Sequence, residues 1–308
     1  MDDSGDYLHP GKLFVAQHGR ISDRSGVIKY AEFLREESGL SDDPPVNLDP
    51  IIQRFRPSLR RVALDGQAGL LLNPDRGLIF INSDDPATRQ RFSVAHELME
   101  LLFDALTPGS QWSSRGGRLF SDKAKERLCE AGAAELLMPF STFAPRVTES
   151  GVSLEAGKHL AELYDVSLTA ALVRAVRHGP GEHAFVLWRL ALKPSEQKGL
   201  PSDKQLSLFE DWTPQSPCKK LRVCWGCSTQ DKFFVPEHKS VEFDTTIYQC
   251  YESGMAAQGT DWIDLASVCG QCYCESMPII LDEEVHVLSV IHLPGDEHSI
   301  TDCLSQNQ

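Results

Sequence analysis

The residues best suited to chemistry lie in the stretch RFSVAHELMELLFD, residues 91–104. His96 and Glu100 are four residues apart, so on a helix they lie on one face, with Glu97 beside them. An imidazole and a carboxylate one turn apart can hold a divalent metal ion, and a neighbouring glutamate can act as general base toward the attacking water. The zinc-peptidase signature HExxH ends in a second histidine, where this sequence has Glu100. The stretch therefore predicts either a metal site with a carboxylate in place of one imidazole or the remains of such a site.

Further ligands must come from another part of the chain, because a catalytic zinc ion takes three protein ligands and leaves one position open. The segment SDKAKERLCEAGAAELLMP, residues 121–139, is predicted to be the next long helix. It carries Glu126 and Glu130, one turn apart. Either glutamate is a candidate for the third ligand, and the spacing alone does not choose between them.

A second candidate metal site is formed by two C-x-x-C pairs, Cys224 with Cys227 and Cys269 with Cys272. Two such pairs, each on a tight turn, are typical of a four-thiolate structural zinc site. The alternative is a set of unligated cysteines. The chain has nine cysteines, an odd number, which argues against a disulfide framework and favours reduced thiols in a cytoplasmic protein.

The pattern of apolar residues predicts the elements that must position these side chains. Three short β-prone runs, RRVAL, AGLLLN and GLIFINS, are separated by turn residues and predict an antiparallel meander. The helix with the HExxE motif follows, over about residues 88–105. Residues 153–179 predict two helices joined at YDVS, with Ser167 as the N-cap of the second, and HAFVLWRLAL predicts a strand that returns to the first sheet.

Composition divides the chain into four segments and predicts an α+β fold. We expect a loose leader over residues 1–26, a helical domain with a small antiparallel sheet over 27–192, a polar linker over 193–217, and a β-rich domain over 218–308. The last segment holds all but one of the cysteines and is expected to be a zinc-ribbon-like module with a structural zinc ion.

Charge and hydropathy argue against two classes of partner, nucleic acids and membranes. A formal net charge of −14 disfavours direct nucleic-acid binding, because phosphate-binding surfaces are built from clustered lysine and arginine. No apolar run approaches the roughly 20 residues of a membrane span, and the acidic start MDDSGDYLHPGK is unlike a secretory signal. We expect a cytoplasmic protein without a membrane partner.

Three motifs in order, QRFSVAHELMELLF, ERLCEAGAAELLMP and YDVSLTAALVRAV, resemble the ImmA/IrrE family of metallo-endopeptidases over residues 27–192. Members of that family show AHELGH, then FAAELLMP, then a similar helix pair. The resemblance implies a zincin-like fold and a catalytic zinc ion. It implies that His96 is the first zinc ligand, Glu97 the catalytic glutamate and Glu126 the downstream glutamate ligand. It further implies a protein substrate, often a helix-turn-helix repressor in a stress or mobile-element response.

The sequence departs from the family pattern at three positions. Glu100 stands where the family has its second histidine, Met99 where it has glycine, and Glu130 where it usually has asparagine. An anionic ligand in place of a neutral one weakens the Lewis acidity of the metal and favours harder ions, manganese or iron(II), over zinc. We therefore expect weak hydrolysis. The alternative is an inactive pseudo-peptidase that serves as a protein-binding or sensor module.

Overall fold

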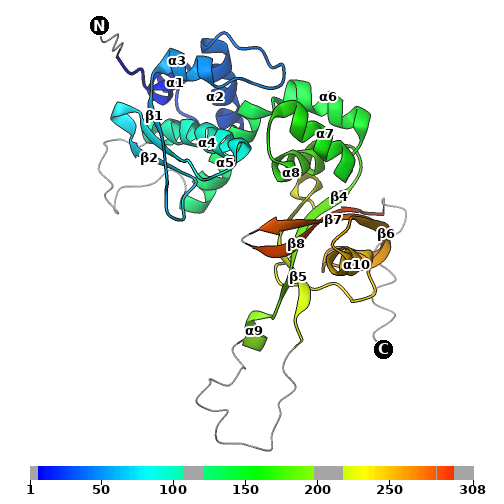
Figure 1. The fold of residues 1–308 in the computed structure, drawn as a ribbon. Coiled ribbons are helices and arrows are strands. Elements are labelled where there is room, and N and C mark those ends of the chain that lie inside the picture. Colours follow the sequence, from blue (N-terminus) through cyan, green and yellow to red (C-terminus); the bar gives the residue numbers. More distant parts are fainter. Residues whose placement is uncertain (1–5, 107–120, 198–217, 282, 295–308) are drawn as a thin grey trace, which may run out of the picture. The chain divides into compact units, whose positions relative to one another are not determined.

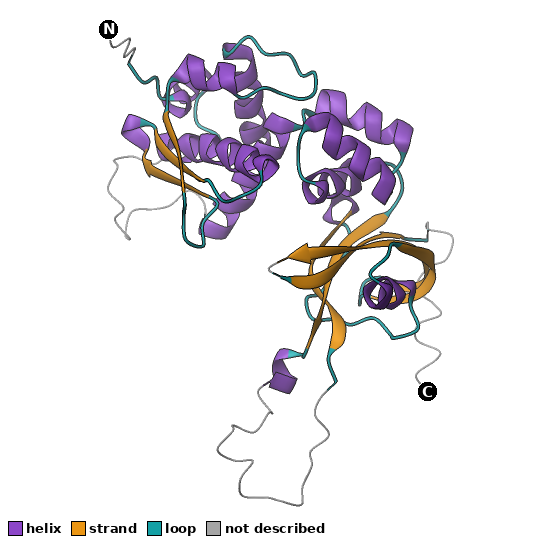
Figure 2. Cartoon of the chain, viewed as in Figure 1, coloured by secondary structure: helices purple, strands orange, loops and turns teal. Residues whose placement is uncertain are grey.

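The computed structural model describes residues 6–106, 121–197, 218–281 and 283–294 (Figure 1). The fold is mixed α/β, with a helical domain and a C-terminal antiparallel sheet (Figure 2). Contacts between residues divide the chain into two units that alternate along the sequence. One contains Met1–Arg146 and Lys158–Ala171, and the other contains Val147–Gly157 and Leu172–Gln308. Among the described helices, none has the length and hydropathy needed to cross a membrane.

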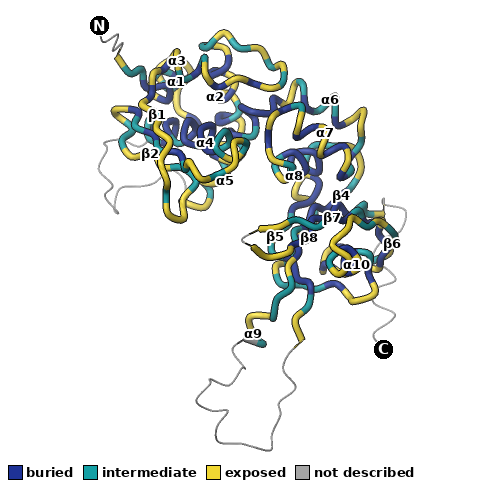
Figure 3. Tube along the Cα trace, in the orientation of Figure 1, coloured by how far each residue is buried: buried dark blue, intermediate teal, exposed yellow. Residues whose placement is uncertain are grey.

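The first unit is built around a long central helix, α4, which is largely buried (Figure 3). The two long helices predicted around the HExxE and AAELLMP motifs are confirmed as α4 (Ala87–Leu106) and α5 (Asp122–Leu137). Two further helices precede them, α2 (Arg24–Glu37) and α3 (Asp49–Phe55). Asp23 caps α2 by accepting a hydrogen bond from Gly26 N, and Ser121 caps α5 by accepting one from Ala124 N.

A small sheet of three strands lies beside α4, and its strand order differs from the predicted meander. The strands are β1 (Ser58–Val62), β2 (Gly69–Asn73) and β3 (Leu78–Asn82), in the order β1-β3-β2. The PDRG turn does join antiparallel strands, β2 and β3, but β1 pairs with β3 in parallel. The Asn82 side chain bonds to both the backbone N–H and the carbonyl of Leu64, which holds the connection after β1 beside β3. The prediction of a meander is therefore wrong.

The expected loose leader contains a packed helix, α1 (Pro10–His18). Phe14 is buried against the rings of Tyr30 and Phe33. A Cβ atom at Gly11 would lie 2.2 Å from the carbonyl oxygen of Leu101, so the backbones of α1 and α4 are nearly in contact. The prediction of a loose segment is wrong over residues 10–18, because packing against α4 stabilises a helix too short to be stable alone.

Three further helices follow: α6 (Phe140–Ser150), α7 (Leu154–Tyr164) and α8 (Leu168–His178). The predicted break at YDVS is confirmed. Asp165 has a left-handed backbone with φ 51°, and the Ser167 hydroxyl accepts a hydrogen bond from Ala170 N at 3.2 Å.

The second unit contains five strands, β4 (His183–Ala191), β5 (Lys220–Ser228), β6 (Ala257–Asp264), β7 (Cys269–Leu281) and β8 (Glu284–His292). They form an antiparallel sheet in the order β5-β4-β8-β7-β6. Its helix α10 (Thr246–Ser253) contributes Ile247 and Tyr248 to a buried core shared with Trp188 of β4. The strand predicted to return to the first sheet is β4, and that prediction is wrong because β4 pairs with β5 and β8. The short helix α9 (Pro194–Gln197) lies in the predicted linker, whose residues 198–217 are outside the described residues.

Candidate metallopeptidase site

Close packing between α4 and α5 brings the predicted site residues together. A Cβ atom at Gly132 of α5 would lie 2.5 Å from Met99 Sδ of α4, so glycine lets the two helices pack closely at this crossing. The Tyr30 hydroxyl of α2 donates a hydrogen bond to the carbonyl of Leu98 at 3.1 Å. The motif is thus held by packing and by a buried hydrogen bond.

His96 lies between two carboxylates. Its Nε2 atom is 3.1 Å from Glu126 Oε1, and its Nδ1 atom is 3.8 Å from Glu97 Oε1. Burial acts to lower the pKa of His96, but the neighbouring carboxylates outweigh burial and raise the pKa above its ordinary value. Nε2 is buried and makes no hydrogen bond despite its distance from Glu126. An orphaned imidazole nitrogen that faces a carboxylate suits a metal ligand.

Glu97 is buried between α4 and the edge strand of the small sheet. It is 6% exposed, and a Cβ atom at Gly69 of β2 would lie 2.7 Å from Glu97 Oε1. The bare glycine backbone leaves room for the carboxylate on the Nδ1 side of His96. Sequence analysis did not identify Gly69, although a glycine at the start of a strand can mark a close approach of this kind.

We expect Gly69→Ala to reduce hydrolysis by roughly 10- to 100-fold, because displacement of a catalytic group by about 1 Å has an effect of that size. The unfolding midpoint should change little, since the atom displaced is the movable end of a side chain. Initial rates and thermal unfolding would test this. Ser58→Ala, on β1 at the opposite edge of the sheet, is the matched control. Unchanged rates for Gly69→Ala would show that β2 does not position Glu97.

Glu100, predicted as the second ligand, is engaged by two residues of α5. One carboxylate oxygen pairs with Lys125 Nζ, and the other accepts a hydrogen bond from Cys129 Sγ at 3.5 Å. Burial and the nearby Glu100 charge raise the pKa of Cys129, so it remains a thiol that can donate. Sequence analysis missed both partners; Lys125, which directly precedes Glu126, was the available signal.

The structure thus brings together two of the three predicted metal ligands, His96 and Glu126. Glu130 is exposed one turn farther along α5. Within the described parts of the chain, no three His, Cys, Asp or Glu side chains are arranged to hold a metal ion. The donor types suit a divalent ion, but Glu100 would have to leave Lys125 to join them.

The four cysteines predicted to bind zinc do not come together. Cys224 and Cys227 lie on β5, whereas Cys269 and Cys272 lie on β7, and two strands separate them. At about 4.8 Å per strand, the two pairs are roughly 14 Å apart, too far for thiolates that each lie about 2.3 Å from one zinc ion. Each pair also lies in extended strand rather than in a turn. The described residues 218–281 and 283–294 therefore do not form the predicted four-thiolate site, and the zinc-ribbon character is not confirmed.

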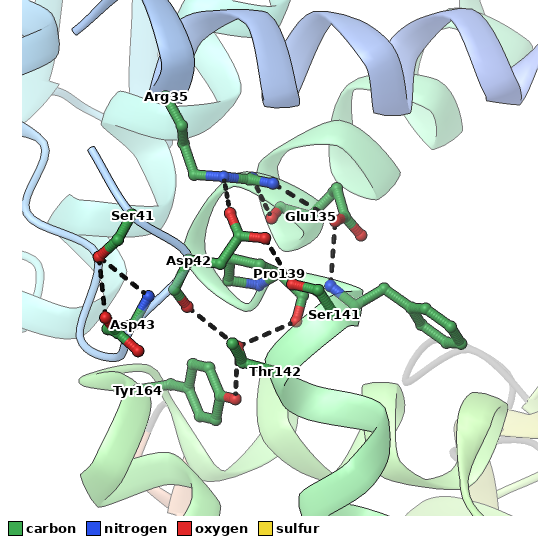
Figure 4. A network of polar contacts seen from close by, with 10 residues as sticks. Arg35, Ser41, Asp42, Asp43, Glu135, Pro139, Ser141, Thr142 and Tyr164 are labelled. Atoms are coloured by element: carbon green, nitrogen blue, oxygen red, sulfur yellow. Dashed lines mark hydrogen bonds and ion pairs between the residues drawn. The ribbon is translucent and has the colours of Figure 1, made fainter. Parts of the chain in front are cut away.

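The glutamate of the AAELLMP motif has a structural role. Glu135 lies beside Arg35, whose Nη2 atom is 3.8 Å from Glu135 Oε1 and whose Nη1 donates to the Glu135 carbonyl at 2.9 Å (Figure 4). Arg35 Nε also donates to Asp42 Oδ1 at 2.7 Å, and Glu135 accepts a hydrogen bond from Phe140 N at 3.0 Å. These hydrogen bonds and ion pairs connect α2 and the loop after it with the C-terminal end of α5.

Residues 58–176 match the model of the IrrE N-terminal-like domain, a peptidase family. These residues are therefore similar to the members of that family. The IrrE-like segment includes the whole α4–α5 site and agrees with the resemblance seen in the sequence.

Two curated relatives of this IrrE-like chain are named radiation response metalloprotease IrrE. The protein from Deinococcus deserti is 32% identical over 155 residues, which cover 49% of this chain and 52% of the relative. The protein from Deinococcus radiodurans is 29% identical over 134 residues, which cover 42% and 40%. The chain thus spans about half the length of the relatives it matches. A Mycobacterium tuberculosis transcriptional regulator has a similar fold, with a TM-score of 0.56 and 12% identity over 92% of this chain and 80% of that chain.

Proposed function

We propose that this chain is a metal-dependent endopeptidase that cleaves a protein substrate. The observation that carries the proposal is the meeting of His96, Glu97 and Glu126 at the α4–α5 crossing. Its position inside an IrrE-like segment, whose relatives are named metalloproteases, supports the same function.

Each residue has a distinct role in this proposal. His96, through Nε2, and Glu126 would hold the ion, and Glu100 would join them. A bound divalent ion would polarise the peptide carbonyl and make water a better nucleophile. Glu97 would take a proton from the attacking water at a carboxylate oxygen and deliver it to the leaving amine. Two carboxylate ligands suit manganese or iron(II) as well as zinc.

The small sheet offers a way to present an extended substrate. β2 is at the edge of the described sheet, and its Gly69 lies against Glu97. A peptide that adds to this edge through main-chain hydrogen bonds would pass beside the catalytic glutamate. Leu70 and Leu72 of β2 are partly exposed and would contact its side chains. The relatives' name, radiation response metalloprotease, supports a stress-related substrate. The resemblance described in the sequence analysis favours a helix-turn-helix repressor.

Metal removal should abolish cleavage. We expect the purified protein to hydrolyse members of a quenched fluorescent peptide library, to lose this activity after dialysis against EDTA, and to regain it with one equivalent of zinc or manganese. Fluorescence rates and mass spectrometry of the products would measure this. A protein that binds neither ion and cleaves nothing would instead be the pseudo-peptidase binding module.

A further inference from the structure

Two groups of polar side chains lie next to each other where α4 faces α5. His96 of α4 meets Glu126 of α5. One turn farther along α4, Glu100 meets Lys125 and Cys129, which are themselves one turn apart on α5. Glu100, the predicted remaining metal ligand, is therefore held by Lys125 and Cys129 beside the contact between His96 and Glu126.

Lys125 opposes metal binding by Glu100 in two ways. Its ammonium group pairs with one carboxylate oxygen, and because the Cys129 thiol donates to the other, both oxygens are engaged. Lys125 would also place a positive charge beside a divalent cation bound by Glu100, and like charges repel. Neither partner is freely solvated: the side chains of Lys125 and Glu100 are 33% and 18% exposed.

We propose that Lys125 is an internal competitor for the metal site and sets its affinity for divalent cations. With Lys125 on Glu100, the protein offers only His96 and Glu126. Metal binding with three ligands requires the ammonium group to leave the carboxylate and swing outward, which its partial exposure permits. Lys125 is thus a residue that controls metal loading, and this inference rests on the proposed metallopeptidase function.

Zinc titration of the full chain by isothermal calorimetry tests the proposal. Lys125→Met removes the charge and keeps most of the side-chain volume, so zinc affinity should rise about tenfold; loss of one partly exposed ion pair accounts for about fivefold of this, and relief of repulsion for the rest. Lys125→Arg retains the ion pair and should bind zinc as the wild type does. Lys123→Met, which removes an exposed lysine of the same helix, is the control for net charge.

Circular dichroism would show that each variant is folded, and Lys125→Gln replaces Lys125→Met if the latter is not. Unchanged or weaker zinc affinity on loss of Lys125, in a wild-type protein that binds zinc and cleaves peptides, would overturn the competitor role and leave the proposed function intact. If neither the wild type nor either neutral variant bound zinc, and a parallel titration showed no binding of manganese or iron(II), both the competitor role and the proposed function would be overturned. Tighter binding by the neutral variants that His96→Ala abolishes would support the proposal.

Discussion

Glu97→Gln is expected to lower the rate of peptide hydrolysis by at least about 100-fold, because general-base catalysis contributes roughly 10²- to 10⁴-fold. The amide has nearly the same shape as the carboxylate but cannot accept the proton of the attacking water at neutral pH. Glu97 approaches His96 from the Nδ1 side, away from the Nε2 atom that faces Glu126, so metal binding should persist. Steady-state rates and metal content, measured on the same preparation, would separate the two effects.

The matched control is Glu36→Gln, which removes an exposed carboxylate from α2 and should leave the rate unchanged. Because Glu97 is buried, thermal unfolding must be compared before the rates are interpreted. Full cleavage activity in the Glu97→Gln protein would contradict the assignment of this residue as general base. If a cellular phenotype also survived the substitution, hydrolysis would not be the function and the binding-module alternative would take its place.

Arg35→Met is expected to lower the free energy of unfolding by about 3–5 kcal/mol, the typical effect of removing one partner of a buried ion pair. Arg35 is 3% exposed, and its loss would remove an ion pair from the buried Glu135 carboxylate and a hydrogen bond from the Glu135 carbonyl. Asp42 would lose the same partner but is partly solvated. Urea unfolding monitored by circular dichroism would measure the difference.

Arg54→Met provides the comparison, because Arg54 forms a surface ion pair with Glu37, and such pairs contribute at most about 1 kcal/mol. A similar small loss for Arg35→Met would mean that the network of Figure 4 does not stabilise the junction between α2 and α5.

The helices and their order were predictable because helix formation depends on residues that are close together in the sequence. Apolar spacing identified α4 and α5, and Ser167 identified the start of α8. The order of the strands was not predictable in this way. The pairing of β1 with β3 is accompanied by a hydrogen bond between Leu64 and Asn82, which are 18 residues apart, and a local pattern does not reveal such a contact. The sequence of β4 likewise does not specify which sheet it joins.

The sequence predicted the residues of the candidate site that share one helix or one motif, but not the contacts between helices. Helical spacing and the family resemblance located His96, Glu97 and Glu126, but the ion pair between Glu100 and Lys125 depends on how two helices face each other. The cysteine prediction failed because a C-x-x-C spacing has no fixed geometry outside a turn. In strands, cysteines such as Cys227 and Cys272 are buried as small apolar side chains.

The contact between Met99 and Gly132 makes the sizes of these two residues depend on each other. The ImmA/IrrE motif that the sequence resembles has glycine at the position of Met99 and phenylalanine at the position of Gly132, so the larger side chain lies on the opposite helix. A side chain at residue 132 would overlap Met99 Sδ unless Met99 moved. The space between α4 and α5 thus has room for one large side chain at this point, and it can come from either helix.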